Sequence, residues 1–417
     1  MLPPPRVRRG ARAGEPAARG GVAARPTIPF VLQRWIGWLA IALACAAVAP
    51  ALAAPAARHR IVGYVLASPA PLRPVSLESL PVGRLTHLNV AFAAVDADGR
   101  IVAEAERFAG LRALKRRHPH LKVLVSVGGW SGSGRFSDVA LAAPSRARFA
   151  DSAVAFIRRQ GLDGVDIDWE FPVAGGKPDN ARRPEDRRNF TLLLQALREK
   201  LDAAARADRR RYLLTAVVGH TEGDLLHTEP AALAAAADWL NVMAYDMNGP
   251  WSKVAAHIAP LQTDPAMQVR GTSPRNNVTD LVERWLKAGV PPHQLVLGVP
   301  FYGYSWKGCP PARRGEYQQC AGPGRGSWEA GALDYGDVER LLGARSGFER
   351  HWNAQAKSAF LYNPATGEFV SYEDPQSLRA KLRLVKQRRL GGVMFWELGA
   401  DRRQTLLGLV ARELRGR

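Results

Sequence analysis

Short apolar runs rich in valine and leucine recur along this chain from residue 60 onward, and stretches with the period of a helix lie between many of them. Such runs, alternating with crossover helices, favour a parallel sheet, and eight of them suffice to close a barrel. One helical stretch has a single apolar face made by Phe190, Leu193, Leu194, Leu197 and Leu201. We therefore predict an α/β protein with a (β/α)8 TIM barrel over residues 60–410. The predicted strands are Ile61–Leu66, Leu85–Phe92, Lys122–Gly128, Gly164–Trp169, Tyr212–Val218, Trp239–Tyr245, Gln294–Val299 and Gly392–Trp396.

About ninety residues separate the seventh predicted strand from the eighth, which is too long for a loop without structure of its own. This stretch contains two cysteines and a series of aromatic side chains between Trp328 and Tyr372. We predict a small α+β subdomain at residues 301–374, inserted on the rim of the barrel between strands 7 and 8. A helix is expected to begin near Pro375.

The fourth predicted strand carries acids at alternate positions, Asp166, Asp168 and Glu170. Side chains alternate between the two faces of a strand, so the three carboxyl groups point into the barrel while the apolar residues between them face the helices. Neighbouring like charges raise at least one pKa, which keeps a carboxyl group protonated near neutral pH. Glu170 lies at the C-terminal end of the strand, where barrel enzymes carry their chemistry. A divalent-metal site is the alternative, but no histidine accompanies the acids.

The segment Asp163-Gly-Val-Asp-Ile-Asp-Trp-Glu170 resembles the signature D-x-x-D-x-D-x-E of the family 18 glycoside hydrolases, the chitinase family. Further segments resemble strand motifs of that family in the expected order. They are Ser126-Val-Gly-Gly129, Met243-Ala-Tyr-Asp246, Gly298-Val-Pro-Phe-Tyr-Gly303 and Gly391-Gly-Val-Met-Phe-Trp396. The resemblance extends from about residue 60 to about residue 410 and indicates a bacterial-type member with an insertion domain.

The resemblance implies a glycosidase without a nucleophile from the protein, in which the substrate's own 2-acetamido group attacks the anomeric carbon. Glu170 would protonate the glycosidic oxygen, and two displacements would retain the anomeric configuration. Asp168 would orient the acetamido group, and Asp166 would share a proton with Asp168. Tyr245 would donate a hydrogen bond to the acetamido oxygen. No cofactor and no metal ion are implied.

Further positions are expected to bind the sugar or to support the acids. The resemblance implies that Asp246 holds the sugar and that Trp396 forms a stacking floor beneath it. Other residues expected to bind substrate are Met243, Tyr64, Phe92 and Trp130, and the aromatic ones among them could equally belong to the core. Residues expected to have structural roles are Asp163, Ser126, Gly128 and Gly129.

The N-terminus has the pattern of an export signal. Arg34 precedes an apolar run at residues 35–49, and Ala51-Leu-Ala53 follows as a cleavage site of small residues. The run is shorter than the roughly 20 residues that a spanning helix needs, although an uncleaved leader that anchors the chain is an alternative. We predict an N-terminal extension and signal peptide at residues 1–53, a secreted or periplasmic protein, and no stable membrane partner after cleavage.

The cysteines agree with export. Cys45 lies in the predicted leader, which leaves Cys309 and Cys320 as a pair in a loop rich in glycine and proline. In an oxidising compartment a disulfide between them would stabilise the loop by lowering the entropy of the unfolded chain. Two free thiols are the alternative. Two cysteines without a nearby histidine cluster do not favour a metal site.

The formal net charge is +20, and it falls to +14 without residues 1–53, which hold seven arginines and one acid. The remaining cations form short clusters without zinc-finger spacing, an aromatic RNA-binding signature or basic heptads. We therefore expect no nucleic-acid partner. A basic surface would favour anionic cell-wall material.

Together these patterns predict a secreted, monomeric chitinase that acts on chitin or another polysaccharide containing N-acetylglucosamine. One alternative is an endo-β-N-acetylglucosaminidase that acts on peptidoglycan or N-glycans. Another is a non-catalytic chitin-binding lectin of the same fold. Such lectins typically lack the acid, so the presence of Glu170 favours an enzyme.

Overall fold

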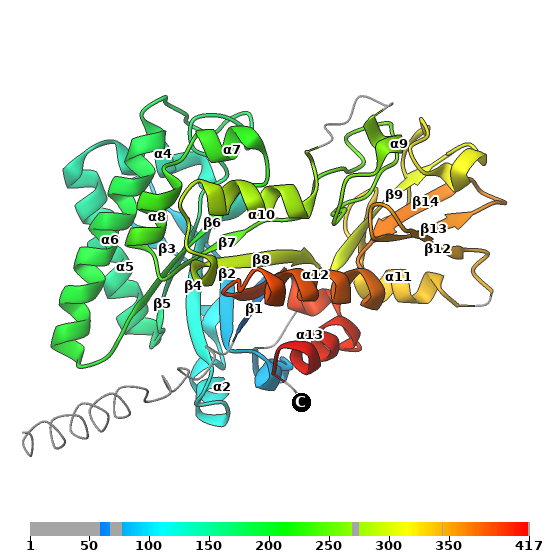
Figure 1. Ribbon diagram of the computed structural model, residues 1–417. Helices are drawn as coiled ribbons and strands as arrows, with labels where there is room; N and C mark the ends of the chain where they lie inside the picture. Colours follow the sequence, from blue (N-terminus) through cyan, green and yellow to red (C-terminus); the bar gives the residue numbers. More distant parts are fainter. Residues whose placement is uncertain (1–58, 67–76, 269–274, 344, 416–417) are drawn as a thin grey trace, which may run out of the picture. The chain divides into compact units, whose positions relative to one another are not determined.

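The computed structural model describes residues 59–66, 77–268, 275–343 and 345–415 of the chain. In this part, eight parallel strands form a closed barrel in the order β1-β15-β8-β7-β6-β5-β4-β2, and pairing of β1 with β2 closes it (Figure 1). The predicted (β/α)8 barrel is thereby confirmed. Its strands are β1 (Arg60–Leu66), β2 (His87–Val95), β4 (Lys122–Gly128), β5 (Gly164–Asp168), β6 (Leu213–Val218), β7 (Trp239–Val242), β8 (Leu295–Pro300) and β15 (Gly392–Trp396).

Helices surround the barrel and bury apolar faces against it (Figure 1). The apolar face predicted around Phe190 lies on α6, and all five of its residues are buried. Trp169, directly after β5, packs between Phe136 and Phe190, with ring centroids 5.5 and 5.4 Å away. The main helices of this layer are α2 (Leu111–Arg117), α4 (Phe136–Leu141), α5 (Ala143–Gln160), α6 (Asp186–Asp208), α7 (Glu222–Leu226), α8 (Pro230–Ala236), α10 (Val278–Lys287), α12 (Pro375–Gln387) and α13 (Thr405–Arg415).

One strand boundary differs from the sequence expectation, and one connection lacks a regular crossover helix. The sixth predicted strand reaches Tyr245, but β7 ends at Val242, because the next residues turn away and Asp246 adopts the left-handed backbone conformation at φ 57°. Between β1 and β2 the described residues form only two short 3-10 helices, η1 (Leu77–Ser79) and η2 (Val82–Arg84). Pro81 lies between them and lacks the amide hydrogen that a continuous helix would need.

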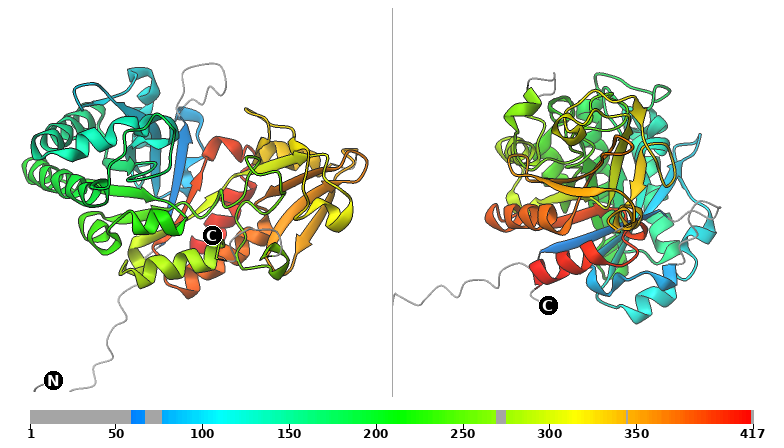
Figure 2. Two further views of the ribbon diagram at one scale, coloured as in Figure 1. Left: turned by 90° about the horizontal axis from the view of Figure 1, so that it is seen from above. Right: turned by 90° about the vertical axis from the view of Figure 1, so that its right-hand side faces the viewer.

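A second, antiparallel sheet lies between β8 and β15 in the sequence. Its strands follow the order β10-β9-β14-β13-β12, and β11 pairs with β9. Figures 1 and 2 show this sheet in yellow and orange. It corresponds in position to the subdomain expected at residues 301–374. Its elements are β9 (Tyr302–Lys307), β10 (Gly322–Pro323), β11 (Ala332–Asp334), α11 (Tyr335–Leu341), β12 (Glu349–Asn353), β13 (Ser358–Asn363) and β14 (Glu368–Tyr372).

The connection from β7 to α10 packs against this second sheet, which the sequence did not indicate. Ala255 donates its amide to the Gln318 carbonyl at 3.0 Å, and it accepts from the Tyr317 amide at 2.8 Å. The buried imidazole of His257 is 2.8 Å from the Glu316 carboxylate. The β7–α10 connection therefore packs against the loop between Cys309 and Cys320, which we call the cysteine loop.

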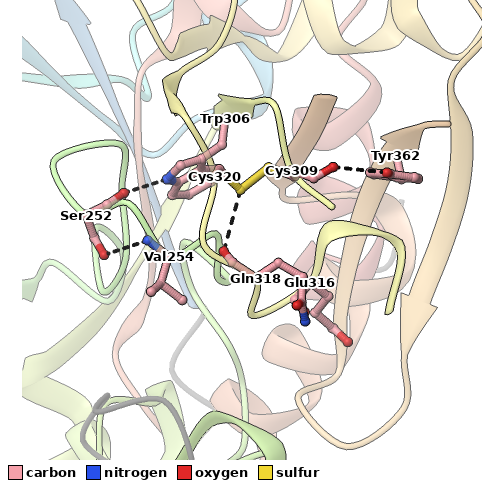
Figure 3. The surroundings of a disulfide bond; sticks show 8 residues. All are labelled: Ser252, Val254, Trp306, Cys309, Glu316, Gln318, Cys320 and Tyr362. Atoms are coloured by element: carbon pink, nitrogen blue, oxygen red, sulfur yellow. Dashed lines mark hydrogen bonds between the residues drawn. A yellow bond between two sulfur atoms is a disulfide. The ribbon is translucent and has the colours of Figure 1, made fainter. Parts of the chain in front are cut away.

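Figure 3 shows the disulfide between Cys309 and Cys320, both of which are buried. The Tyr362 hydroxyl donates to the Cys309 carbonyl oxygen at 3.2 Å, which joins the cysteine loop to β13. The Trp306 indole N–H donates to the Ser252 carbonyl oxygen at 2.8 Å and joins β9 to the β7–α10 connection. The disulfide thus closes a loop that has partners on both sides.

Asp163 is buried directly before β5 and connects three parts of the barrel. Its carboxylate accepts from Lys115 of α2 at 2.7 Å, from the Val123 amide of β4 at 2.8 Å, and from Arg210 at 2.6 Å. These contacts lie at the end of β5 that is remote from Glu170. They agree with the structural role expected for Asp163.

The predicted leader and Cys45 lie outside the described residues. Within the described ranges, no helix has the length and the apolar character required to cross a bilayer.

We predict that Asp163→Ala will lower the free energy of unfolding by about 2–4 kcal/mol, because Lys115 and the Val123 amide lose a buried charged acceptor. Urea denaturation of both proteins would measure the difference. Asp202→Ala removes a more exposed ion pair with Arg198 and should cause a much smaller decrease. Equal stability of the Asp163 and Asp202 variants would contradict the proposed role of Asp163.

We also predict that replacing Cys309 and Cys320 together with serine will lower the free energy of unfolding by about 2–3 kcal/mol. The disulfide closes a loop of 11 residues in sequence separation, and its loss restores entropy to the unfolded chain. Wild-type protein in a reducing agent should match the double variant. A wild-type stability that is unchanged by the reducing agent would argue against this contribution.

Candidate active site

The inward-facing acids of β5 lead to the C-terminal end of the barrel. Asp166 and Asp168 lie on β5 and are buried, and Glu170 follows two residues after the strand ends. The register places Asp166 between Ser126 of β4 and Thr215 of β6. The three predicted acids therefore project into the barrel in sequence, with Glu170 nearest to the rim.

Asp166 accepts hydrogen bonds from four neighbouring strands. The Tyr64 hydroxyl donates to Oδ2 at 2.7 Å and the Ser126 hydroxyl donates to the same oxygen at 2.8 Å. Thr215 donates to Oδ1 at 2.5 Å and the Asn241 amide at 3.3 Å. Burial raises the pKa of Asp166, while these hydrogen bonds act in the opposite direction because they stabilise the carboxylate.

Asp168 has a very different environment. Its Oδ1 is buried and has no hydrogen-bond partner among the described residues. Burial is the main cause that raises the pKa of Asp168 well above its usual value, and the charges of Glu170 and Asp166 add to it. We expected Asp166 and Asp168 to share a proton. Within the described residues, no hydrogen bond joins their two carboxyl groups. Asp168 is instead a buried carboxyl group with an unused oxygen.

Glycines allow the strand next to the acids to approach closely. A Cβ atom on Gly128 would lie 2.2 Å from the Asp168 carbonyl oxygen, and its φ of 107° also favours glycine. A Cβ atom on Gly129 would lie 2.5 Å from the Phe92 ring. Neither position therefore has room for a Cβ atom.

The backbone of Glu170 is fixed on both sides. The Ser133 hydroxyl accepts from its amide at 2.9 Å, and the Asn180 side chain donates to its carbonyl oxygen at 2.9 Å. Burial raises the pKa of the Glu170 carboxyl group to about 8, and the negative charges of Asp246 and Asp224 contribute. A pKa of about 8 favours the protonated carboxyl group at neutral pH, and the two hydrogen bonds hold the backbone of Glu170 in place.

The loop after β7 contributes Met243, Tyr245 and Asp246. Met243 is half-buried against the core, whereas Tyr245 is buried and its hydroxyl lies 3.9 Å from the Met394 sulfur. The Tyr302 hydroxyl donates to Asp246 Oδ1 at 2.5 Å. Burial raises the pKa of Asp246 to about 6, although hydrogen bonds from tyrosines oppose this effect.

Aromatic rings line the same end of the barrel. Trp396, the last residue of β15, stacks on Phe92 with centroids 5.3 Å apart and planes at 17°. Its ring is also 5.9 Å from that of Tyr64. Tyr64 itself is buried and bonded to Asp166, so its position supports the acid and does not offer an exposed platform. Trp130, by contrast, is 53% exposed.

The structure thus brings together every residue of the predicted catalytic set, and their catalytic roles stay predictions. Sequence reasoning missed Thr215 and Asn241, although each is a polar residue within an otherwise buried strand and could have been noticed for that reason. It also missed Ser133 of η4 (Ser133–Arg135), Asn180 of the β5–α6 connection and Asp224 of α7, because no local pattern relates them to Glu170. Within the described ranges, no group of three or more His, Cys, Asp or Glu side chains is arranged to hold a metal ion.

Comparison with known proteins agrees with this arrangement. The model of the family described as glycosyl hydrolases family 18 matches residues 60–401. Chitinase A1 of Niallia circulans is 48% identical over 307 residues, which cover 73% of this chain and 44% of that protein. The chain thus spans less than half the length of this relative. Chitinase B of Serratia marcescens is 30% identical over 384 residues, covering 77% of this chain and 74% of that protein.

Solved structures give the same result. Chitinase ChiA74 from Bacillus thuringiensis superposes with a TM-score of 0.81 at 34% identity, covering 86% of this chain and 70% of that one. A family 18 N-acetylglucosaminidase from Paenibacillus barengoltzii superposes with a TM-score of 0.76 at 36% identity, covering 85% of this chain and 100% of that one. The barrel, the acids of β5 and the match over residues 60–401 lead to one conclusion: the chain belongs to family 18 of the glycosyl hydrolases.

Proposed function

We propose that this protein hydrolyses β-1,4 linkages between N-acetylglucosamine residues of chitin, with Glu170 as the general acid. The observation that carries this proposal is the position and protonation of Glu170. Its carboxyl group lies at the C-terminal end of the barrel, where barrel enzymes act, and its pKa of about 8 leaves it protonated at neutral pH. The relatives named as chitinases support chitin as the substrate.

In the proposed reaction, Glu170 donates its proton to the glycosidic oxygen as the bond to the anomeric carbon breaks. The carbonyl oxygen of the substrate's acetamido group attacks the same carbon and forms a cyclic oxazolinium intermediate. The Glu170 carboxylate then takes a proton from water, which attacks the anomeric carbon and reopens the ring. Two inversions at one carbon give retention, without a nucleophile from the protein.

Asp168 is suited to orient the acetamido group. Its Oδ1 has no partner within the described residues, so it can accept the acetamido N–H without breaking a bond in the protein. Among the described residues, the one hydrogen-bond partner of the Tyr245 hydroxyl is the Met394 sulfur at 3.9 Å, so this hydroxyl can donate to the acetamido oxygen.

The aromatic side chains favour a carbohydrate ligand. Trp396 is half-buried and stacks on Phe92, so its exposed part would pack against a sugar ring. Trp251 and Trp328 are 66% and 38% exposed and contact Tyr304 and Tyr302, respectively. Sugars present apolar C–H faces that pack on such rings. These side chains would form a row of stacking positions for several sugar units.

Export of the protein is a further part of the proposal. The apolar run at residues 35–49 and the small residues that follow have the pattern of a cleaved leader. A disulfide between Cys309 and Cys320 is stable in an oxidising compartment. Both features support action outside the cytoplasm, where a polymeric substrate is accessible.

We predict that Glu170→Gln will lower kcat on chitin oligosaccharides by about 100- to 10,000-fold, because the amide cannot donate a proton. The Kd for the same oligosaccharides should change little, since the side chain keeps its size. Steady-state hydrolysis and calorimetric binding would measure these quantities. Glu185→Gln, at the exposed start of α6, is the matched control and should retain full activity.

Retained activity in the Glu170 variant would refute the assignment of the acid. Glucose oligomers with β-1,4 linkages should not be cleaved, because they lack the acetamido group. Cleavage of them would refute substrate assistance while leaving Glu170 as the acid. Product analysis would separate release of single N-acetylglucosamine units from release of longer products, and parallel assays on peptidoglycan and N-glycans would test the alternative substrates.

The pH dependence should follow the titration of Glu170. Since the acid must be protonated, kcat/KM should fall as pH rises through about 8. Asp224→Asn removes a negative charge that raises the Glu170 pKa, so the fall should move to lower pH. Asp202→Asn, on the outer helix α6, should leave the profile unchanged. A pH profile that is the same in Asp224→Asn and in the wild type would contradict this origin of the raised Glu170 pKa.

The free energy of unfolding should also depend on the titration of Glu170. The Glu170 pKa is raised on folding from an ordinary value of 4.5, so the protonated form favours the folded state. This contribution is complete below about pH 4.5 and is lost as pH rises through about 8. Thermal unfolding should therefore show that Glu170→Gln gains stability relative to the wild type as pH increases.

A further inference from the structure

The loop between β10 and β11 carries an exposed carboxylate beside the proposed sugar site. This β10–β11 loop consists of residues 324–331. Trp328 and Glu329 are neighbours in it, and both side chains are exposed. The Trp328 ring contacts that of Tyr302, with centroids 6.3 Å apart, and the Tyr302 hydroxyl donates to Asp246 Oδ1 at 2.5 Å. The loop therefore reaches the residues that surround Asp246.

The backbone of the β10–β11 loop is tightly closed. The Ala332 amide donates to the Glu329 carbonyl oxygen at 3.1 Å, and Ala332 pairs with Tyr304 of β9. The Ser327 amide donates to the Ala332 carbonyl oxygen at 2.6 Å. A Cβ atom on Gly326 would lie 1.6 Å from the Glu329 carbonyl oxygen, so this turn has no room for a side chain there. Glu329 is thus anchored next to β9.

The carboxylate of Glu329 is not used within the protein. In the part of the chain that the structure describes, Glu329 forms no ion pair. The cations that flank it in the sequence already have partners: Arg325 contacts Glu368 at 2.7 Å, and Arg340 contacts Asp337. An exposed carboxylate in this position can therefore accept a cationic group of a ligand.

The negative charge of Glu329 acts on the site itself. Burial is the main cause that raises the pKa of Asp246 to about 6, hydrogen bonds from Tyr302 and Tyr304 oppose it, and the charge of Glu329 adds to it. Burial and the charge of Asp246 raise the pKa of Tyr304, and Glu329 adds to this shift as well. Glu329 is therefore close to both side chains.

Two arginines also lie near the site, but their charges act elsewhere. Arg275 and Arg284 line a recess of about 490 Å³ together with Asp246, Trp251 and Glu222. Burial lowers the pKa of Arg284, and the charge of Glu222 opposes this effect. Neither arginine is among the charges that shift the pKa of Asp246. The charge that the β10–β11 loop adds beside Asp246 is therefore negative.

We propose that Glu329 binds the ammonium group of a deacetylated sugar unit, so that partially deacetylated chitin is a preferred substrate. This inference rests on the proposed function, because it concerns the same substrate site. A glucosamine unit carries a free amine, which is cationic in mildly acidic solution. The unit whose linkage is cut must keep its acetamido group for substrate assistance. The glucosamine unit therefore occupies another position, and Trp251 and Trp328 offer rings for such neighbouring units.

The test compares fully acetylated and partially deacetylated oligosaccharides of one length in mildly acidic buffer of low salt. In Glu329→Gln, the ratio of kcat/KM for the deacetylated over the acetylated substrate should fall about 2- to 5-fold. The amide keeps the size and the hydrogen bonds of the side chain but not its charge. High salt should lower the wild-type ratio in the same direction.

Glu349→Gln is the matched control. It removes the same charge from an exposed position at the start of β12, which is at the other end of the second sheet from β9 and β10. This variant should keep the wild-type ratio. An unchanged ratio in Glu329→Gln, or an equal fall in both variants, would overturn the inference. Thermal unfolding would verify that each variant is folded.

The sequences of the products, determined by mass spectrometry, separate this inference from the proposed function. Substrate assistance requires N-acetylglucosamine at every new reducing end, in the wild type and in both variants. The inference requires in addition that glucosamine be enriched at one fixed distance from the cleaved bond, and that Glu329→Gln lose this enrichment. Enrichment that persists in Glu329→Gln would overturn the inference alone. Glucosamine at the new reducing ends would instead overturn substrate assistance.

Discussion

The carboxylate of Asp166 is the contact on which the interior of this barrel depends. It receives hydrogen bonds from β1, β4, β6 and β7, so one side chain connects half of the strands at the centre of the molecule. A charge at this depth is stable only because every bond is made. The same bonds oppose the effect of burial, which raises the pKa of Asp166, and the charge of Asp166 in turn raises the pKa of Asp168. Asp168 then holds its proton more firmly, and so does Glu170, through burial and its own acidic neighbours.

The environments of the three acids thus follow from their distance to the rim. Asp166 is deepest and fully bonded, Asp168 has an unused oxygen, and Glu170 lies past the strand where it can reach a ligand. The residues that fix these positions are small or polar. Gly128 permits close contact with the Asp168 backbone, and Ser133 and Asn180 hold the Glu170 backbone.

The sequence by itself determined the barrel, the direction of the β5 acids and the helical face around Phe190. These features depend on the local spacing of apolar residues, which can be read directly from the sequence. The resemblance of five segments to one family also identified the members of the site. Local spacing does not predict which distant segments contact each other. The donors to Asp166 come from residues 64 to 241, and the packing of His257 on Glu316 joins two loops that are 59 residues apart.

Only the tertiary structure decided the end of β7 and the protonation of the acids. Val242 ends the strand because the next residues turn toward the site, a choice that depends on the neighbours of Asp246 and not on the apolar run. The raised pKa of Glu170 depends on burial and on Asp246 and Asp224, which the fold brings close from other connections. A sequence can show that acids share a face, but their electrostatic environment exists only once the barrel has closed.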